Sequence, residues 1–262
     1  MASGGGGEGR SSREFWGVRR WGGDNSTYTE TNPMARLGLE AARGDLLCML
    51  ERLNAGDSIN AVDGPDARTA LHMAAAAGQN ASLEWLLDRG ADFSISSRAG
   101  STPLHLAAWN GHDETCLRLL YRAPDLLDVR NASGHTALHW AAAHGHSTVI
   151  EVLVRQGADV CAVNGEGEAP LTLAARGGHE DVVVALLKCP RCRPDQPDHL
   201  GNTALHGAAL SGHAQVLSHL VEAGASHAAR NRQGFTARDC LEMLPRLYAR
   251  QEETLAYLRG FG

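Results

Sequence analysis

Apolar residues return at helical spacing inside a fixed frame. In residues 101–112, Leu104, Ala107 and Ala108 lie at i, i+3 and i+4, so they share one face of a helix. Paired alanines let a neighbouring helix approach closely, and Gly111 readily takes the positive φ at which helices often end. The stretch therefore predicts a short helix with one buried face.

The same frame recurs several times along the chain. Its marker is the position just before the helix, usually Thr, whose hydroxyl is well suited to cap a helix. Successive markers are 33 or 34 residues apart, and they are Thr69, Thr102, Thr136, Ala169, Thr203 and Thr236. A fixed period in this range predicts a solenoid of stacked repeats.

Each unit also predicts a second helix and an extended hairpin. In one unit the second helix carries Leu117 and the pair Leu119-Leu120, and a Gly-Ala-Asp turn follows the second helix in other units. Pro103 and Pro170 fall at the first position of the first helix, where a missing N–H costs little. A unit thus reads as helix, turn, helix and hairpin.

This pattern resembles the ankyrin repeat. The family's signature, Thr-Pro-Leu-His-x-Ala-Ala with a following Gly-His and a later Gly-Ala-Asp, stands nearly complete from Thr102 onward, and the resemblance covers residues 33–262. It implies an all-α solenoid of stacked helix-turn-helix units with short β-hairpin loops.

The departures from the signature predict the domain organisation. Residues 1–32 are rich in Gly, Ser and Arg without apolar periodicity, so we expect a disordered tail. Terminal repeats are expected to be atypical, which gives an N-terminal cap and a C-terminal cap around five full repeats. The predicted boundaries are 33–63 for the first cap, 64–96, 97–130, 131–163, 164–197 and 198–230 for the repeats, and 231–262 for the last cap.

One segment of the tail carries side chains suited to binding. Residues 13–21 interleave three aromatics with three arginines, and the aromatics lie within Phe15–Trp21. The segment is either a peptide that docks on a partner, a sticky piece of tail, or a stretch that folds back over the first repeat.

Charge and cysteine content restrict the partners and the compartment. A net charge of −6 and a pI near 6.1 argue against broad binding to nucleic acid. No apolar run approaches the roughly 20 residues that a membrane span needs, and the N-terminus lacks a signal-peptide core. The six cysteines are scattered, which favours a reducing location in the cytoplasm or the nucleus.

Histidine is abundant, but most histidines belong to the repeat frame. Four occupy the Thr-x-Leu-His position, where the resemblance implies a hydrogen bond to the backbone of the adjacent hairpin, and four more follow the Gly of the inter-helix turn. His135 and His144 fall instead at variable positions that we expect to be exposed. These variable histidines are candidates for binding.

The chain offers little for catalysis or for a cofactor. Phosphate loops and nucleophile motifs are missing, so we predict neither an enzyme nor a cofactor. Cys189 and Cys192 have half the spacing of a zinc site, in a segment that replaces the usual turn and adds one residue. A loop variation, a labile disulfide and a partial metal site remain open for this pair.

Binding is expected from the positions that vary between repeats. The resemblance implies contacts from hairpin tips and from the two positions after Ala-Ala. The predicted contact residues are Arg98, Ser101, Trp109, Asn110, His135, His144, Glu166, Glu168, Arg176, His199, Asn202 and Leu210.

Two tryptophans have alternative interpretations. Trp109 is either an interface anchor or a residue that packs laterally on the next repeat. Trp140 replaces an apolar frame residue, so we expect it in the core. The mixed charge of Glu166, Glu168 and Arg176 suits a folded protein or peptide more than a phosphate backbone.

The sequence predicts a monomeric, intracellular protein–protein interaction module that presents a concave surface to a protein or peptide. We expect this module to bind neither nucleic acid nor membrane. It acts either as a stand-alone inhibitor or scaffold, or as an adaptor that recruits a substrate to a larger complex such as a ubiquitin ligase. In the adaptor, Phe15–Trp21 would be the second contact.

Overall fold

The computed structural model describes residues 36–243 and 249–260. All of them lie in the unit that spans Met34–Gly262. The helices of this unit are α1 (Arg36–Arg43), α2 (Leu46–Asn54), α3 (Ala70–Ala76), α4 (Asn80–Asp88), α5 (Pro103–Asn110), α6 (Asp113–Arg122), the short 3-10 helix η2 (Pro124–Leu126), α7 (Ala137–His144), α8 (Ser147–Arg155), α9 (Pro170–Gly177), α10 (Glu180–Leu187), α11 (Ala204–Ser211), α12 (Ala214–Glu222), α13 (Ala237–Glu242) and α14 (Ala249–Arg259).

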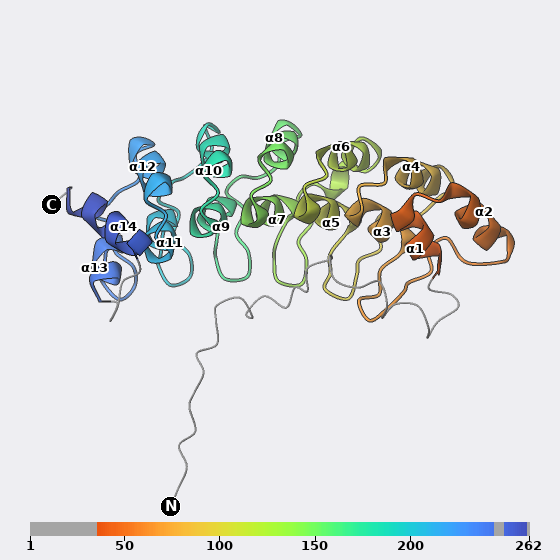
Figure 1. Ribbon diagram of the computed structural model, residues 1–262, viewed down its shortest axis with the longest axis horizontal. Coiled ribbons are helices and arrows are strands. Elements are labelled where there is room, and N and C mark those ends of the chain that lie inside the picture. The colour runs from red at the N-terminus through yellow and green to blue at the C-terminus, as the bar shows by residue number, and fades with distance from the viewer. Residues whose placement is uncertain (1–35, 244–248, 261–262) are drawn as a thin grey trace, which may run out of the picture. The chain divides into compact units, whose positions relative to one another are not determined.

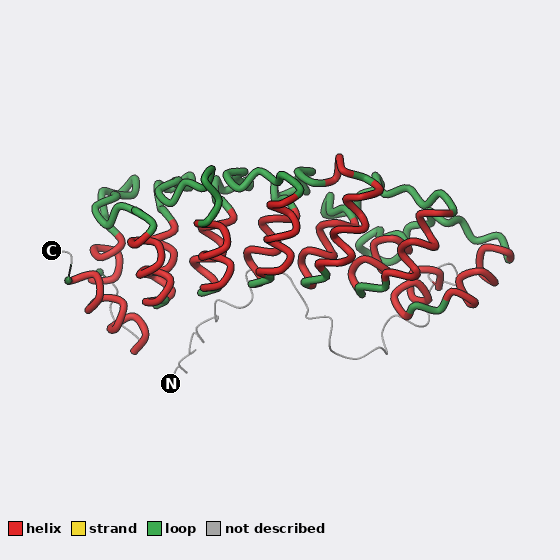
Figure 2. The backbone as a smooth tube through the Cα atoms, turned by 90° about the horizontal axis from the view of Figure 1, so that it is seen from above, coloured by secondary structure: helices red, strands yellow, loops and turns green. Residues whose placement is uncertain are grey.

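The helices form two parallel rows. We call α3, α5, α7, α9 and α11 the inner helices, and α4, α6, α8, α10 and α12 the outer helices; Figure 1 shows each row running along the stack. Each inner helix contacts the next inner helix and the outer helix of its own repeat. In the view from above, most of the loops lie along one edge of the stack, and short turns between helices lie at the opposite edge (Figure 2).

The predicted apolar face forms the core. One leucine per inner helix is almost completely buried, and these are Leu71, Leu104, Leu138, Leu171 and Leu205. The alanine pairs beside them are also fully buried, which brings adjacent inner helices close together. They belong to one continuous core cluster that runs from repeat to repeat.

Local hydrogen bonds fix where an inner helix begins. Thr102 has an extended backbone (φ −88°, ψ 168°) and precedes Pro103 at the first helical position. His105 Nδ1 accepts from the Thr102 backbone N–H at 3.2 Å and lies 2.9 Å from the Thr102 hydroxyl. The imidazole therefore takes the place that Glu or Gln has in an ordinary capping box.

The same histidine joins its repeat to the next one. His105 Nε2 lies 2.9 Å from the backbone carbonyl of His135, so its N–H donates to the following hairpin. Equivalent bonds are made by His72, His139 and His206. The backbone role implied by the resemblance is confirmed for all four.

The inter-helix turns are also joined from repeat to repeat. Gly145 ends α7 with φ of +78°, and the ring of His179 from the next repeat lies against it. His179 Nε2 lies 3.0 Å from the carbonyl of Ala143 and donates to it. His112 and His146 make the same contact with the repeat before each of them.

The connections that we predicted as β-hairpins are hairpin-like tight turns without strands among the described residues. Within the residues described, the structure has only an isolated bridge between Asp63 and Arg68 in place of strands. Neighbouring turns are joined by single backbone bonds, such as Ala132 N–H to Ala99 O at 3.0 Å. One bond per repeat is too few to build a strand ladder, which explains the difference.

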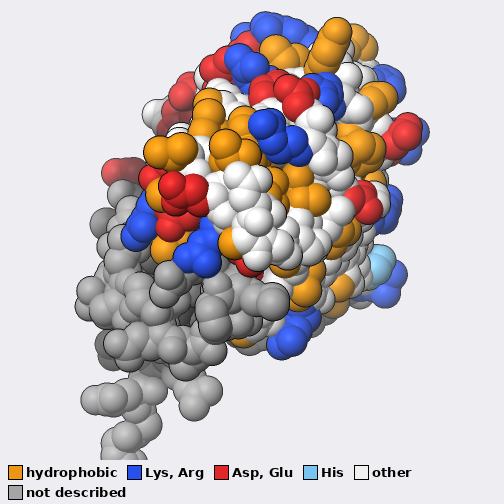
Figure 3. Space-filling model, turned by 90° about the vertical axis from the view of Figure 1, so that its right-hand side faces the viewer, with side chains coloured by type: hydrophobic (Ala, Val, Ile, Leu, Met, Phe, Trp, Pro, Cys, Tyr) orange, Lys and Arg blue, Asp and Glu red, His pale blue; other side chains and the backbone are white. Residues whose placement is uncertain are grey.

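The ends of the stack differ from its middle. At the N-terminal end α2 buries Met49 alone, while Leu47 is 67% exposed; Figure 3 views the stack from this end, where apolar side chains reach the surface. At the C-terminal end α14 packs on α11, α12 and α13 and buries Leu255 and Leu258. Every helix among the described residues is too short or too polar to cross a bilayer.

Candidate protein-binding surface

The predicted contact residues come from two kinds of segment. Those on the hairpins are Arg98, Ser101, His135, Glu166, Glu168, His199 and Asn202. Those in the last two turns of inner helices are Trp109, Asn110, His144, Arg176 and Leu210. Both segments recur once per repeat, so their side chains form rows along the stack.

Burial separates these residues into three groups. Arg98, Asn110, Glu166, His199 and Leu210 are exposed, and Trp109, His144, Arg176 and Asn202 are half-buried. Three others are almost fully buried: Ser101, His135 and Glu168. The expectation that His135 is exposed is therefore wrong, because its ring is covered by neighbouring side chains.

Four aromatic rings lie against one another. The ring centroids of Trp109 and Trp140 are 4.3 Å apart, and His144 lies 4.0 Å from Trp109. Trp140 stacks on His135 at 4.8 Å with an interplanar angle of 20°. We call Trp109, His135, Trp140 and His144 the aromatic cluster.

The cluster decides between the alternatives for the tryptophans. Trp109 packs laterally on the next repeat and is also partly accessible, so the packing role is real and leaves a surface for contact. Trp140 is half-buried, so the expectation that it belongs to the core is wrong. Its indole lies against His135 and Trp109, which keeps the ring beside the core and not inside it.

A buried polar network supports the cluster from the next hairpin. Asn164 Nδ2 lies 3.1 Å from His135 Nε2 and donates to Glu168 Oε2 at 3.0 Å. Asn164 Oδ1 accepts the backbone N–H groups of Glu166 and Glu168, each at 2.9 Å. Glu168 also forms an ion pair with Arg176 on α9.

Two of these positions were not predicted as parts of the site from the sequence. Asn164 was not proposed, although an Asn or Asp occupies the equivalent place at Asn131, Asp198 and Asn231 and accepts two backbone N–H groups there too. That recurrence was the available signal. Trp140 was assigned to the core because its position is apolar in most repeats.

The two variable histidines are held neutral. Burial lowers the pKa of His144, and a hydrogen bond to the carbonyl of Trp140 opposes this shift only in part. Burial also lowers the pKa of His135. The charge of Glu168 raises this pKa, and the charge of Arg176 lowers it. The cluster therefore carries little imidazolium charge at neutral pH.

Formal charge is distributed unevenly between the two rows. Arg176 is the single Asp, Glu, Lys or Arg on the five inner helices. The outer helices carry ion pairs between repeats, with Arg118 and Arg122 bound to Glu84, and Arg122 also bound to Asp88. The inner helices that carry Trp109, Trp140 and His144 thus contribute no formal charge of their own to the aromatic cluster.

Other groups that could bind a metal or act as nucleophiles have structural roles. Among the described residues, Glu40, Asp45 and Cys48 are the trio whose ligand-type atoms come close enough for a metal, but Asp45 caps α2 by accepting the Cys48 N–H at 3.0 Å. Cys189 and Cys192 are free thiols in a turn closed by a 2.9 Å backbone bond. Burial raises the pKa of Cys192 to about 11, which makes its thiol a poor nucleophile.

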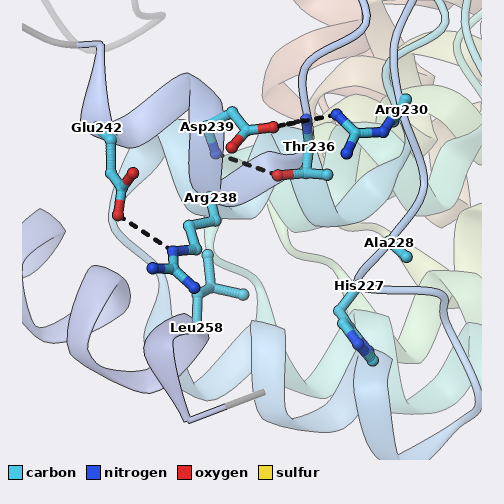
Figure 4. Close-up of a pocket in the computed structure, with 8 residues that line it drawn as sticks. All are labelled: His227, Ala228, Arg230, Thr236, Arg238, Asp239, Glu242 and Leu258. Carbon is cyan, nitrogen blue, oxygen red and sulfur yellow. Dashed lines mark hydrogen bonds and ion pairs between the residues drawn. The ribbon is translucent and has the colours of Figure 1, made fainter. Parts of the chain in front are cut away.

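A cavity of about 370 Å³ lies at the C-terminal cap (Figure 4). Its polar walls are already paired: Arg230 binds Asp239 at 3.4 Å, and Arg238 binds Glu242 at 3.1 Å. Thr236 caps α13 by accepting the Asp239 N–H at 3.1 Å. These contacts hold α13 in place and leave balanced charge around the cavity.

The predicted Phe15–Trp21 contact lies outside the described residues.

A stack of helix pairs with recurring hairpins defines a solenoid repeat protein. The chain belongs to the ankyrin repeat family, because the family model for ankyrin repeats (3 copies) matches residues 37–129, 83–164, 117–198 and 138–232. The resemblance carried by Thr102 and the residues after it is therefore confirmed.

Known proteins share parts of this stack. The chain is 30% identical over 161 residues to the nuclear factor NF-kappa-B p105 subunit of Gallus gallus, and 34% identical over 157 residues to the human transient receptor potential cation channel subfamily A member 1. Each match covers 60% of this chain but only 16% and 11% of those two proteins. The crystal structure of the human ASB11 ankyrin repeat domain superposes with a TM-score of 0.71 at 26% identity, covering 87% of this chain and 98% of that one.

Proposed function

We propose that this protein is an intracellular binding module that holds a protein or peptide partner against its inner helices and hairpins. The observation that carries the proposal is the aromatic cluster. Trp109 and Trp140 are large rings that remain partly accessible on inner helices, where one alanine after another is fully buried. Tryptophan is enriched among the residues that contribute most to protein–protein binding.

The rigidity of the surface supports this role. Each of Trp109, Trp140 and His144 is packed against at least one other ring, so few rotamers remain to be lost when a partner binds. A surface ordered before association avoids part of the entropic cost of binding. The repeats present such a surface without a conformational change.

The predicted contact residues divide into two roles under this proposal. Those that touch the partner are Arg98, Trp109, Asn110, His144, Glu166, Arg176, His199, Asn202 and Leu210. Ser101, His135 and Glu168 act from beneath, since each is less than 9% exposed.

The test is a triple substitution on a partner found by proximity labelling in cells. Trp109→Ala, His144→Ala and Arg176→Ala together should weaken binding at least about a hundredfold, because anchors of this kind each contribute about 1–2 kcal/mol or more. The control is Leu117→Ala, Tyr121→Ala and Arg155→Ala on the outer helices, where Tyr121 is 88% exposed. Equal effects of the two variants, or intact binding by the first, would show that the inner face is not the site.

An adaptor role is the second candidate, favoured by the aromatics and arginines of residues 13–21. An adaptor needs a second contact besides the repeat surface. Pull-downs with the full chain and with a chain lacking residues 1–32 distinguish the two functions. Loss of a catalytic partner with retention of a substrate supports the adaptor, and an unchanged partner set contradicts it.

A further inference from the structure

We propose that Trp109, Trp140 and His144 form a subsite for one uncharged apolar side chain of the partner, of the Leu, Met or Phe class. The subsite deepens the proposed function and rests on it. Two alternatives, a cationic anchor and an anionic anchor, are outcomes of the test described below.

The geometry of the rings favours an apolar anchor. Trp109 and Trp140 lie on successive inner helices with an interplanar angle of 51° at 4.3 Å, so the two indoles meet at a tilt. His144 continues the stack at 39° to Trp109. Tilted, half-buried rings offer both edges and faces to an aliphatic or aromatic side chain, which gains dispersion contacts with all three rings.

The surrounding charges argue against a cationic anchor. A cation that is covered over an indole loses its hydration, and a nearby carboxylate can offset that loss. The carboxylate beneath the cluster, Glu168, is 3% exposed and is already bound by Arg176 and Asn164. The charges of Glu168 and Arg176 act in opposite directions on the pKa of His135, as expected for an ion pair that leaves little net charge to attract a second cation.

An anionic anchor is disfavoured by the state of the histidines. His144 is neutral at neutral pH because it is largely desolvated, and a partner that covers it removes still more water. The nearest formal cation on the inner helices, Arg176, is paired with Glu168. A neutral anchor is therefore the one that matches both the rings and the charges.

The position of Trp140 is fixed before binding. Its ring lies nearly parallel to that of His135, and His135 is held by Asn164, which also organises the next hairpin. Asn164 is bound to the backbone of the next repeat, so it holds His135 in place, and His135 in turn restrains the indole of Trp140. His135 and Asn164 are thus positioning residues, and Trp109, Trp140 and His144 make the contact.

The probe is a random-peptide library displayed on phage and selected against the full-length protein at neutral pH. The selected peptides should share a Leu, Met or Phe whose replacement by Ala abolishes binding. Trp109→Ala should weaken them at least about tenfold, since one good anchor is worth roughly 1.4 kcal/mol or more. Tyr121→Ala on the outer helix α6 is the matched control and should leave the affinity unchanged.

Two substitutions at one position test the charge argument. His144→Gln keeps the site neutral but removes one of its three rings, so it should weaken binding by about threefold, less than the loss of a full anchor. His144→Arg puts a charge where the anchor must bury it and should weaken binding at least about tenfold. Circular dichroism of both variants checks that each one is folded.

Three results would overturn the subsite. They are peptides that depend on a shared Arg, Lys, Asp or Glu, peptides that bind the Trp109→Ala variant normally, and equal losses for His144→Gln and His144→Arg. If such peptides still lose their binding to the Glu166→Ala or His199→Ala variant of the protein, the proposed function stands and only the subsite fails. If no inner-face substitution affects any selected peptide, both fail.

Discussion

At the residue scale, the two ring nitrogens of a histidine in the Thr-x-Leu-His position make two different hydrogen bonds. In His139, Nδ1 accepts the Thr136 N–H at 3.1 Å, while Nε2 lies 3.1 Å from the Glu168 carbonyl and donates to it. These bonds require the neutral ring with its proton on Nε2. Protonation of Nδ1 would remove an acceptor from a buried backbone N–H, in addition to the cost of burying the charge.

This arrangement predicts loss of stability in mild acid. Burial lowers the pKa of His72 to about 4, of His105 to about 4 and of His139 to about 3, below the ordinary value of 6.5. The unfolded chain therefore binds protons first, so stability is complete above about pH 6.5 and falls as the pH drops toward 4. Each histidine adds up to about 1.4 kcal/mol per pH unit to the slope, which urea unfolding at a series of pH values measures.

Exchanging the residues at two frame positions between repeats provides the control for this prediction. The fourth full repeat has Ala169 and Thr172 where the others have Thr and His, and it folds in the same way. Thr136→Ala with His139→Thr should make the pH slope shallower by one proton, whereas Ala169→Thr with Thr172→His should make it steeper. A slope indifferent to both swaps would assign the acid sensitivity to other groups.

At the element scale, the turn between the two helices of a repeat depends on a glycine in two ways. Gly145 has a positive φ, and a Cβ built on it would lie 2.5 Å from Nδ1 of His179. Gly157, after the outer helix, also has a positive φ of +97°, but a Cβ there meets nothing within 4 Å. The pair therefore separates backbone strain from a collision between repeats.

We expect Gly157→Ala to cost about 1 kcal/mol from strain alone. Gly145→Ala should cost at least about 2 kcal/mol more, because the His179 ring must move and loses its bond to the Ala143 carbonyl. Denaturant unfolding of both variants measures the difference. Similar losses would mean that the imidazole gives way freely and does not tie the two repeats together.

Periodicity was sufficient to predict the helices and the core, since Leu104 and its equivalents recur in one frame and are buried by neighbours of the same kind. It was insufficient for the candidate site. Trp140 shares its frame position with Met73, Leu106 and Leu173, of which Leu173 alone is buried, and the period does not specify the contacts of its ring with Trp109 and His135. The burial of His135 depends on Asn164, which is 29 residues away in sequence and supplies a contact that the period does not specify.

At the scale of the whole molecule, stability should vary along the stack. An internal helix such as α7 packs on both α5 and α9, whereas α2 contacts helices on one side and leaves Leu47 and Leu50 exposed. In linear arrays each repeat is stabilised by its neighbours, so the ends open first.

Hydrogen exchange followed by mass spectrometry tests this gradient. Amides of α7 and α9 should exchange at least about a hundredfold more slowly than those of α2, which corresponds to roughly 3 kcal/mol of local opening free energy. Uniform protection from α2 to α12 would instead indicate a single cooperative unit.

The aromatic cluster also bears on how such a chain can change over evolutionary time. In-frame duplication or loss of one unit of 33 or 34 residues would preserve the bonds between repeats, since most pairs of successive repeats make the same His–carbonyl and Gly–His contacts. The rings lack that tolerance. Trp109 and Trp140 belong to successive units, and a unit inserted between them would pull the indoles apart. Unequal recombination can therefore lengthen or shorten the stack readily, while the inherited order of two particular repeats is what preserves the aromatic cluster.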